Sequence, residues 1–385
     1  MDKIVVLDFG SQYSHLICRR IRELSVYAEL VPYDISIEEL KKKEPKGIIF
    51  SGGPSSVYNS DAPIPENEIF DFKLPILGIC YGHQLIVNKF GGKVKRANKE
   101  YGSSLLMMEK NSELLEGLGE SIRAWMSHGD EAEKIPDEFD IIGHTDNAHA
   151  AAIANKNRTV FGIQFHPEVI HTEQGTEILK NFVLKICKAK QDWTMEGFIE
   201  KTVNELAKID GNVLCGVSGG IDSTVAALLI HKAIGDRLTG VFVDNGLLRL
   251  NESEEIQEMF MKNFSLNFHK IEAQEKFLSK LRGITDPEDK RKIVGEEFIN
   301  IFTNFAEKNG PFKWLAQGTL YPDVIESGVS KGPAAVIKSH HNVGGLPKEL
   351  NLDLVEPLRN LFKDEVRKLG VQLGLPKPIV YRHPF

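Results

Sequence analysis

The sequence predicts an α/β protein built from two doubly wound domains with mainly parallel sheets. Short apolar runs alternate with amphipathic stretches along all 385 residues, and strands that alternate with helices in this way form parallel sheets. The alternation is interrupted by the polar stretch "KAKQDWTMEGF" (188–198) and restarts with the buried-strand pattern "NVLCGV". We therefore expect one domain over residues 1–189 and a second over residues 190–385.

The first domain is predicted from strands that end in glycine, cysteine or polar residues. These strands are "KIVVLDFG" (3–10), "KGIIFSGGP" (46–54), "LPILGIC" (74–80) and "TVFGIQFHPE" (159–168). Helical patterns run from about Gln12 to Leu24 and from about Gly175 to Lys188.

The second domain begins with a buried strand, a glycine loop and a helix that Gly235 closes. The run "RLTGVFVDNG" (237–246) supplies the next strand. A long helix is expected over residues 285–310, because Thr285 and Glu288 have capping-box spacing and Pro287 suits a first helical turn. The charged run "KDEVRK" (363–368) is interpreted as a solvated helix face.

Composition limits the classes of partner and the compartment. A net charge of −7 and a pI near 6.0 argue against a nucleic-acid or acidic-membrane surface. No apolar run reaches the length of a membrane helix, and no signal-peptide pattern follows Met1. The cysteines show neither CxxC nor zinc-finger spacing, which predicts free thiols in a reduced, cytoplasmic protein: Cys18, Cys80, Cys187 and Cys215.

One cysteine has the surroundings of a nucleophile. In Gly78-Ile79-Cys80-Tyr81-Gly82 the glycines permit a sharp strand-to-helix elbow that lifts Cys80 out of the sheet. The start of the following helix favours a thiolate. The backbone N–H of Tyr81 and one from the glycine loop at Gly53 would then face a developing oxyanion. The alternative is a cysteine that only fills space in the core.

The segment "GIQFHPE" supplies the expected partners of this thiol. His166 and Glu168 are two residues apart in an extended segment, so their side chains point the same way. Cys80, His166 and Glu168 would form a nucleophile, base and orienting group. Together, "GICYGHQ" and "GIQFHPE" resemble the class I glutamine amidotransferases, which release ammonia from glutamine. This resemblance implies glutamine contacts from five residues: Gln84, Tyr101, Ser127, His128 and Asp130.

A second glycine loop, "SGGIDS", lies between the strand "NVLCGV" and a helix. Its glycines and first-turn N–H groups suit an anion, but it has no Walker A lysine. An ordinary glycine turn is the alternative. The full motif resembles the phosphate loop of the ATP pyrophosphatases, which implies that ATP is held by Ser218, Gly219, Gly220, Ile221, Asp222 and Ser223. The resemblance also implies Mg²⁺ beside Asp222.

Several later segments resemble the family of glutamine-hydrolysing GMP synthases, which aminate xanthosine 5′-monophosphate (XMP) to GMP. They are "VFVDNGLLR", "QGTLYPDVIES", "IKSHHNVGGLP" and "VEPLRNLFKDEVRKLG". The resemblance places Val243 near the adenine of ATP. It implies XMP contacts from a second group of residues: Arg249, Asp323, Glu326, Lys338, His340 and His341. The family forms homodimers through a C-terminal domain that is expected to be absent here, since the chain stops at "YRHPF".

Other interpretations of the same loop are weighed against this one. NAD synthetases carry the loop without such a cysteine elbow, and tRNA-modifying enzymes are expected to be basic or to carry CxxC pairs. Asparagine synthetase uses an N-terminal cysteine, whereas position 2 here is Asp2. A nucleotide-sensing module without catalysis and a free-standing glutaminase stay open as alternatives.

Overall fold

The computed structural model describes residues 1–328 and 352–383, except for the side chains at positions 97, 98, 262, 263 and 325–328. The chain divides into two compact units, Met1–Trp193 and Thr194–Phe385. The boundary therefore follows Trp193 and not residue 189. The linker is tied to the first unit because Trp193 N donates to the carbonyl of Ser25 at 2.9 Å, and its ring packs on Tyr27 with 4.8 Å between centroids.

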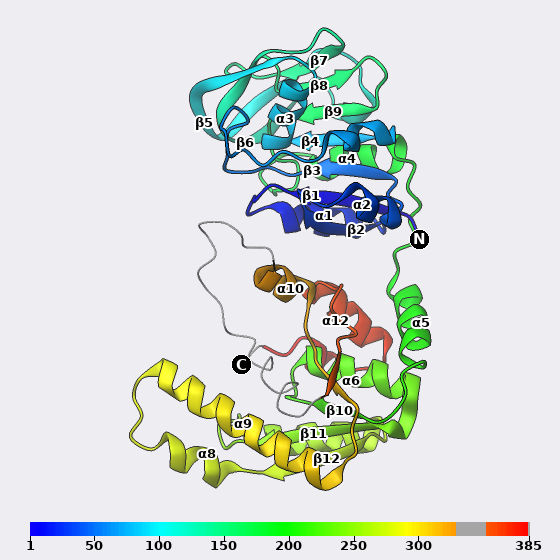
Figure 1. Ribbon diagram of the computed structural model, residues 1–385, viewed down its shortest axis with the longest axis vertical. Helices are drawn as coiled ribbons and strands as arrows, with labels where there is room; N and C mark the ends of the chain where they lie inside the picture. Colours follow the sequence, from blue (N-terminus) through cyan, green and yellow to red (C-terminus); the bar gives the residue numbers. More distant parts are fainter. Residues whose placement is uncertain (329–351, 384–385) are drawn as a thin grey trace. The chain divides into compact units, whose positions relative to one another are not determined.

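The first unit contains a nine-stranded sheet of order β2-β1-β3-β4-β9-β8-β7-β5-β6 (Figure 1). The strands from β2 to β9 in this order pair in parallel, and the rest pair antiparallel. The strand bounds are β1 (Lys3–Asp8), β2 (Tyr27–Pro32), β3 (Gly47–Phe50), β4 (Ile76–Ile79), β5 (Lys93–Met108), β6 (Ser121–Lys134), β7 (Phe139–His144), β8 (Ala152–Asn155) and β9 (Val160–Ile163).

Helices cover the parallel half of this sheet, and the residues between them form the core of the unit. Strands β3, β4 and β9 are buried along their whole length, as expected for parallel strands with helices on both faces. The helical segments are α1 (Ser14–Glu23), α2 (Ile37–Lys43), η1 (Asn67–Phe72), α3 (Tyr81–Lys89), η2 (Glu113–Leu115), α4 (Gly175–Lys180) and η3 (Asn181–Ile186).

The second unit contains a five-stranded, all-parallel sheet of order β12-β11-β10-β13-β14. Its strands are β10 (Val213–Gly216), β11 (Leu238–Asp244), β12 (Asn267–Glu272), β13 (Trp314–Ala316) and β14 (Asp353–Val355). The chain leaves β10 toward β11 on one side and later adds β13 on the other. Ligands of open α/β sheets bind at such a switch point.

Ten helical segments of the second unit lie among the described residues, and α6 follows β10 directly (Figure 1). They are α5 (Met195–Leu206), α6 (Ile221–Ile234), η4 (Gly235–Arg237), α7 (Glu252–Glu258), η5 (Met259–Asn263), α8 (Gln274–Leu281), α9 (Pro287–Asn309), α10 (Tyr321–Gly328), α12 (Lys363–Gln372) and α13 (Lys377–Val380). The predicted α/β class with mainly parallel sheets is confirmed.

The predicted start of the long helix α9 is wrong by one residue. Asp286, not Thr285, is the N-cap, because its carboxylate accepts from the N–H groups of Glu288 and Asp289 at 2.9 and 3.0 Å. Pro287 occupies the first turn, as the sequence predicted, and Gly310 is the C-cap. In the part of the chain that the structure describes, no helix is long and apolar enough to cross a membrane.

Candidate functional site

Cys80 stands at a strained turn between β4 and α3. Its backbone has a φ of 52° and a ψ of −102°, which a residue with a side chain rarely adopts. The glycines on either side make the turn possible. A Cβ on Gly78 would lie 2.3 Å from the carbonyl oxygen of Gly82, and a Cβ on Gly82 would lie 2.5 Å from that of Phe50. The elbow therefore requires glycine at both positions.

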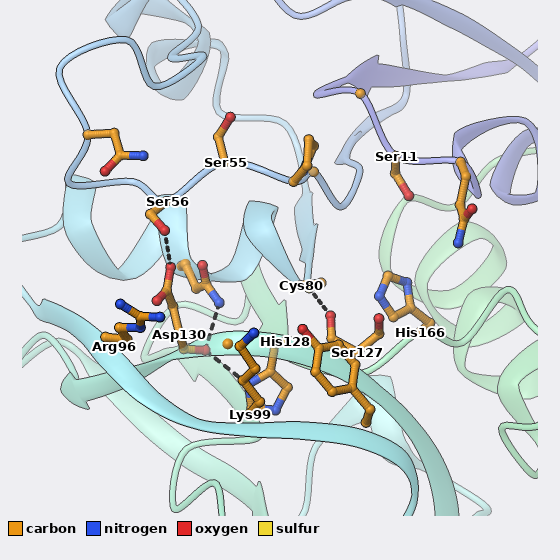
Figure 2. A pocket seen from close by; sticks show the side chains of 18 of the residues that line it. Ser11, Ser55, Ser56, Cys80, Arg96, Lys99, Ser127, His128, Asp130 and His166 are labelled. Atoms are coloured by element: carbon orange, nitrogen blue, oxygen red, sulfur yellow. Dashed lines mark hydrogen bonds between the residues drawn. The ribbon is translucent and has the colours of Figure 1, made fainter. Parts of the chain in front are cut away.

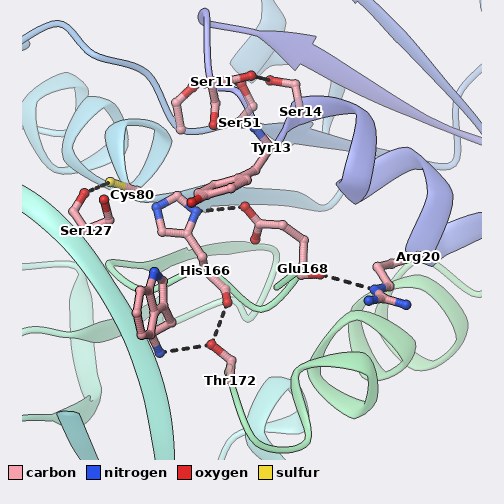
Figure 3. Close-up of polar contacts among 12 residues, drawn as sticks. Ser11, Tyr13, Ser14, Arg20, Ser51, Cys80, Ser127, His166, Glu168 and Thr172 are labelled. Atoms are coloured by element: carbon pink, nitrogen blue, oxygen red, sulfur yellow. Dashed lines mark hydrogen bonds and ion pairs between the residues drawn. The ribbon is translucent and has the colours of Figure 1, made fainter. Parts of the chain in front are cut away.

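His166 and Glu168 follow β9, the neighbour of β4 in the sheet. Nδ1 of His166 lies 2.7 Å from Oε1 of Glu168, and both side chains are buried (Figure 3). A Cβ on Gly52 would lie 3.1 Å from Cε1 of His166 and 3.6 Å from Cβ of Cys80. The imidazole and the thiol therefore meet beside Gly52.

The loop that carries His166 also forms hydrogen bonds with the outer edge of β6, which is the last strand on one side of the sheet. His166 N donates to the carbonyl of Trp125 at 3.0 Å, and Trp125 N donates to Oγ1 of Thr172 at 3.0 Å. Glu173 N donates to the carbonyl of Arg123 at 2.8 Å. The hydroxyl of Thr172 closes the loop on the carbonyl of His166 at 2.6 Å. These bonds fix the backbone of the base.

The charge of His166 is set by opposing effects. Burial disfavours the imidazolium, but the Glu168 carboxylate and a hydrogen bond with Cys80 outweigh it and raise the pKa of His166 from 6.5 to about 11. His166 is therefore protonated at neutral pH beside the Cys80 sulfur. This is the charge state of a base that has already accepted a proton from its nucleophile.

We expect Glu168→Gln to lower the pKa of His166, because burial would then oppose the imidazolium without a carboxylate to offset it. Titration of the His166 ring followed by NMR measures this directly. Glu173→Gln is the matched control, since Glu173 lies on the same loop and its Oε2 accepts from Arg123 N at 3.0 Å. An unchanged His166 titration in Glu168→Gln would show that the carboxylate does not control the imidazole.

A cavity of about 750 Å³ opens beside the Cys80 sulfur (Figure 2). The five residues expected to contact glutamine line it together with Cys80, His166 and Gly53: Gln84, Tyr101, Ser127, His128 and Asp130. They come from α3, β5 and β6, which are far apart in the sequence. Tyr81 holds the first position of α3, where a backbone N–H has no partner within the helix.

Charged groups of both signs lie in this cavity, and the sequence analysis missed two of them, Arg96 and Lys99. The Asp130 carboxylate is buried and accepts from the hydroxyls of Ser56 and Tyr58. Arg96 lies opposite Asp130 in the β5–β6 ladder, and Lys99 also lines the cavity (Figure 2). Neither cation forms an ion pair with another described residue. Their signal was weak because charged residues on a long strand normally face water.

His128 is held by oxygen atoms at both ring nitrogens. Its Nδ1 lies 3.0 Å from the carbonyl oxygen of Asp130, and its Nε2 lies 3.1 Å from Oε2 of Glu100. The hydroxyl of Ser104 donates to the other oxygen of Glu100 at 2.6 Å. A ring so constrained orients the cavity wall and leaves no nitrogen for a substrate. Tyr101, by contrast, is 65% exposed at the mouth of the cavity.

In the second unit the predicted phosphate loop lies between β10 and α6. Gly219 has a φ of +79°, and Gly220 is the N-cap of α6. The loop is stiffened by Ser223, whose Oγ accepts from Ser218 N at 3.1 Å and donates to the carbonyl of Gly220 at 3.2 Å. Ile221 begins the helix. The loop N–H groups therefore surround the N-terminus of a 14-residue helix, which favours an anion.

One carboxylate oxygen of Asp222 accepts a hydrogen bond, and the other has no hydrogen-bond partner among the described residues. Its Oδ2 accepts from Nζ of Lys363 at 2.5 Å, whereas its Oδ1 is buried without a hydrogen-bond partner among the described residues. Lys363 is 40% exposed, so the interpretation of the run 363–368 as a solvated face holds there, although it missed this ion pair. The interpretation is wrong at Glu365, which is buried and accepts from Phe362 N at 2.8 Å.

The remaining predicted positions are only partly brought together. Val243 is buried near the end of β11, beside β10. Arg249 donates to the carbonyl of His383 at 3.3 Å. Asp323 accepts from Leu320 N at 3.0 Å at the start of α10, which is a capping contact. Glu326 lies in α10, but its side chain is not described, and Lys338, His340 and His341 lie outside the described residues.

Two family models match this chain. The model described as glutamine amidotransferase class-I matches residues 5–186, and the one described as NAD synthase matches residues 193–298. The chain is also 54% identical over 386 residues to the GMP synthase [glutamine-hydrolyzing] of Caldicellulosiruptor saccharolyticus, covering 99% of this chain and 75% of that protein. The chain belongs to the family of glutamine-hydrolysing GMP synthases.

Other known proteins are similar to all or part of this GMP synthase family member. The GMP synthase [glutamine-hydrolyzing] of Carboxydothermus hydrogenoformans is 53% identical over 387 residues, covering 100% of this chain and 76% of that protein. A solved protein of Thermoplasma acidophilum, described as one subunit of a GMP synthase, is 34% identical over 49% of this chain and 94% of its own, with a TM-score of 0.45. Unlike the NAD synthase model, the full-length GMP synthases account for both units.

Proposed function

We propose that this chain is an ATP-dependent GMP synthase that hydrolyses glutamine and uses the ammonia to aminate XMP. The observation that carries this proposal is the presence, in one chain, of a Cys80-His166-Glu168 arrangement beside a cavity and a phosphate loop at Ser218–Ser223. The similarity to named GMP synthases over the whole chain supports it. A glutaminase unit supplies ammonia, and an adenylating unit activates an oxygen of the substrate, so together they can replace that oxygen by nitrogen.

The first half-reaction releases ammonia. His166 holds the proton of Cys80, and the sulfur attacks the carboxamide carbon of glutamine. The N–H groups of Tyr81 and Gly53 would stabilise the oxyanion that forms. His166 then returns the proton to the departing amine, while Glu168 keeps the ring oriented. Water hydrolyses the glutamyl thioester by the same route and regenerates the thiol.

The charges of the cavity match a free amino acid. Glutamine carries an ammonium and a carboxylate on its α-carbon and a neutral amide at its other end. The buried Asp130 carboxylate suits the ammonium, and Arg96 and Lys99 suit the carboxylate. This arrangement would direct the side-chain amide toward Cys80. Gln84, Tyr101 and Ser127 also stay proposed residues of the glutamine site, and His128 is proposed to shape its wall and not to bind glutamine through a ring nitrogen.

The second half-reaction activates XMP. An oxygen of XMP attacks the α-phosphorus of ATP, and pyrophosphate leaves, held by the N–H groups of the loop at Ser218–Ser223. Ammonia then displaces AMP from the resulting ester and gives GMP. Val243, Arg249, Asp323 and Glu326 stay proposed nucleotide or XMP contacts, as do three positions beyond the described residues: Lys338, His340 and His341.

The residues present fit a Mg²⁺ ion that arrives with ATP. Among the described residues, no cluster of three His, Cys, Asp or Glu side chains could hold a metal alone. Asp222, however, has a buried Oδ1 without a partner in the described part of the chain, and Mg²⁺ is usually held by one or two carboxylates plus substrate phosphates. When bound, the ion would offset the negative charge that builds up on pyrophosphate. Lys363 shares Asp222 and would contribute further positive charge.

Two finer expectations belong to the same proposal. The cysteines are free and buried, which suits the reducing cytoplasm. The resemblance implies a homodimer for the family, and sedimentation analysis would establish the oligomeric state of this chain.

The test of the proposal is conversion of XMP to GMP by this chain, followed by chromatography of the nucleotides. We expect GMP, AMP and pyrophosphate in equal amounts when ATP, Mg²⁺ and either glutamine or ammonium are supplied. Omission of XMP is the control and should abolish AMP formation. Glutamine hydrolysis without any XMP-dependent AMP would contradict the synthetase assignment and favour a free-standing glutaminase.

A further inference from the structure

The side chain of Gln164 contacts the proposed nucleophile. Gln164 follows β9, lies two residues before His166 and is 1% exposed. Its Nε2 lies 3.6 Å from Sγ of Cys80, and its Oε1 lies 3.3 Å from Nε2 of Gln84. Its backbone is fixed as well, because Gln164 N donates to the carbonyl of Ala151 at 2.8 Å. Gln164 lies within the quoted segment "GIQFHPE", but the sequence analysis assigned it no role.

The hydrogen-bond network determines which end of the Gln164 amide faces the sulfur. Nε2 of Gln84 donates to the backbone carbonyl of Asp130 at 2.9 Å. A carbonyl oxygen only accepts, so the atom of Gln84 at this place must be its amide nitrogen. The second hydrogen of that nitrogen then points to Gln164. The atom of Gln164 that accepts it must be the amide oxygen, Oε1. Gln164 is therefore left with an N–H group directed at Cys80.

A second group, a backbone carbonyl, also lies beside the sulfur and favours the thiol over the thiolate. The carbonyl oxygen of Ser127 lies 3.6 Å from Sγ of Cys80 (Figure 2, Figure 3). A thiol can donate to this oxygen, whereas a thiolate is repelled by it. The N–H of Gln164 favours the thiolate instead. We propose that Gln164 donates a hydrogen bond to the Cys80 thiolate and keeps the nucleophile charged beside the His166 imidazolium.

This role rests on the proposed glutaminase function and acts at two moments of it. Before attack, the proton of Cys80 lies on His166, and the N–H of Gln164 stabilises the negative sulfur. In the thioester the sulfur is neutral, so the hydrogen bond weakens. When the thioester is hydrolysed, the sulfur leaves with its electron pair and the bond forms again. A hydrogen bond to a charged group of this kind is worth about 10- to 100-fold in a rate.

Gln164→Met tests the proposal, because it removes the donor and nearly conserves the volume. We expect iodoacetamide to alkylate Cys80 about tenfold more slowly near pH 7, with no difference at high pH, where the thiol is ionised in both proteins. Mass spectrometry of the Cys80 peptide gives the rate. The turnover number for glutamine should fall about tenfold with little change in KM. Gln191→Met is the control, since the Gln191 amide donates to the carbonyl of Leu24 at the surface.

Two results would overturn the proposal. The first is an alkylation profile of Gln164→Met that matches that of the wild-type chain. The second is equal slowing at every pH together with a lower melting temperature, which would indicate a packing role. Gln164→Glu serves if the methionine variant does not fold, and its carboxylate should slow alkylation further. Alkylation needs no turnover, so a wild-type chain that reacts with iodoacetamide but hydrolyses no glutamine contradicts the proposed function alone.

Discussion

Replacement of Cys80 by alanine will abolish glutamine-dependent formation of GMP and leave ammonium-dependent formation intact. We expect glutamine hydrolysis to fall by about 10⁴-fold or more, because the sulfur forms the covalent intermediate and no other described thiol lines the cavity. The synthetase reaction should not change, since its loop belongs to the other compact unit. Rates of GMP formation with each nitrogen source, measured on the same preparation, give the answer.

The ammonium reaction serves as the internal control for folding of the second unit. A melting curve of the variant checks the first unit, where the small alanine side chain relieves rather than adds crowding at the elbow. Equal loss of both reactions in a folded variant would mean that Cys80 serves the synthetase step, and the division of labour between the units would be wrong.

Replacement of Asp222 by alanine will remove ATP cleavage while glutamine hydrolysis persists. We expect XMP-dependent release of pyrophosphate to fall by about 10²- to 10³-fold, because the carboxylate is the proposed support for Mg²⁺ at the leaving group. The folding cost should be small, since the partner Lys363 is 40% exposed and can be solvated. A coupled assay for pyrophosphate measures the loss.

Asp222→Asn separates charge from shape in the same experiment. The amide keeps the size of the side chain but removes the negative charge, so it should lose nearly as much activity as alanine. Lys363→Met breaks the same ion pair but keeps the Asp222 carboxylate, so a smaller loss than in Asp222→Ala would assign the effect to the carboxylate. Undiminished pyrophosphate release in Asp222→Ala would rule out the proposed role of the loop.

Local signals predicted the parts of the site that depend on short-range geometry. The elbow at Cys80 could be predicted because its two glycines lie four residues apart and the clash at Gly78 involves the nearby backbone of Gly82. The clash of a Cβ on Gly82 with Phe50 of β3 could not be predicted in this way. The pair His166 and Glu168 was predicted as well, but its basis was wrong, because β9 ends at Ile163 and the chain turns at Glu168 instead of staying extended.

Contacts between residues that are far apart in the sequence could not be predicted from such local signals. The ion pair of Lys363 was missed because helix periodicity cannot reveal a carboxylate 141 positions away. Arg96 and Lys99 reach the cavity through a β5–β6 pairing whose register shifts between Arg96 and Glu100, and a bulge is not visible in an alternation of polar residues. The contact between Gln164 and Cys80 likewise depends on the fold of the whole unit.

The loop that carries His166 links catalysis to solubility. A 14-residue edge strand such as β6 would otherwise offer unpaired backbone groups to any neighbouring chain. The residues from His166 to Glu173 occupy the outward backbone groups of Arg123 and Trp125, so loosening of the loop has two costs at once. A substitution that frees the loop will misplace the base and will also uncover a template for aggregation. Loss of activity and loss of soluble protein should therefore arise together in this segment.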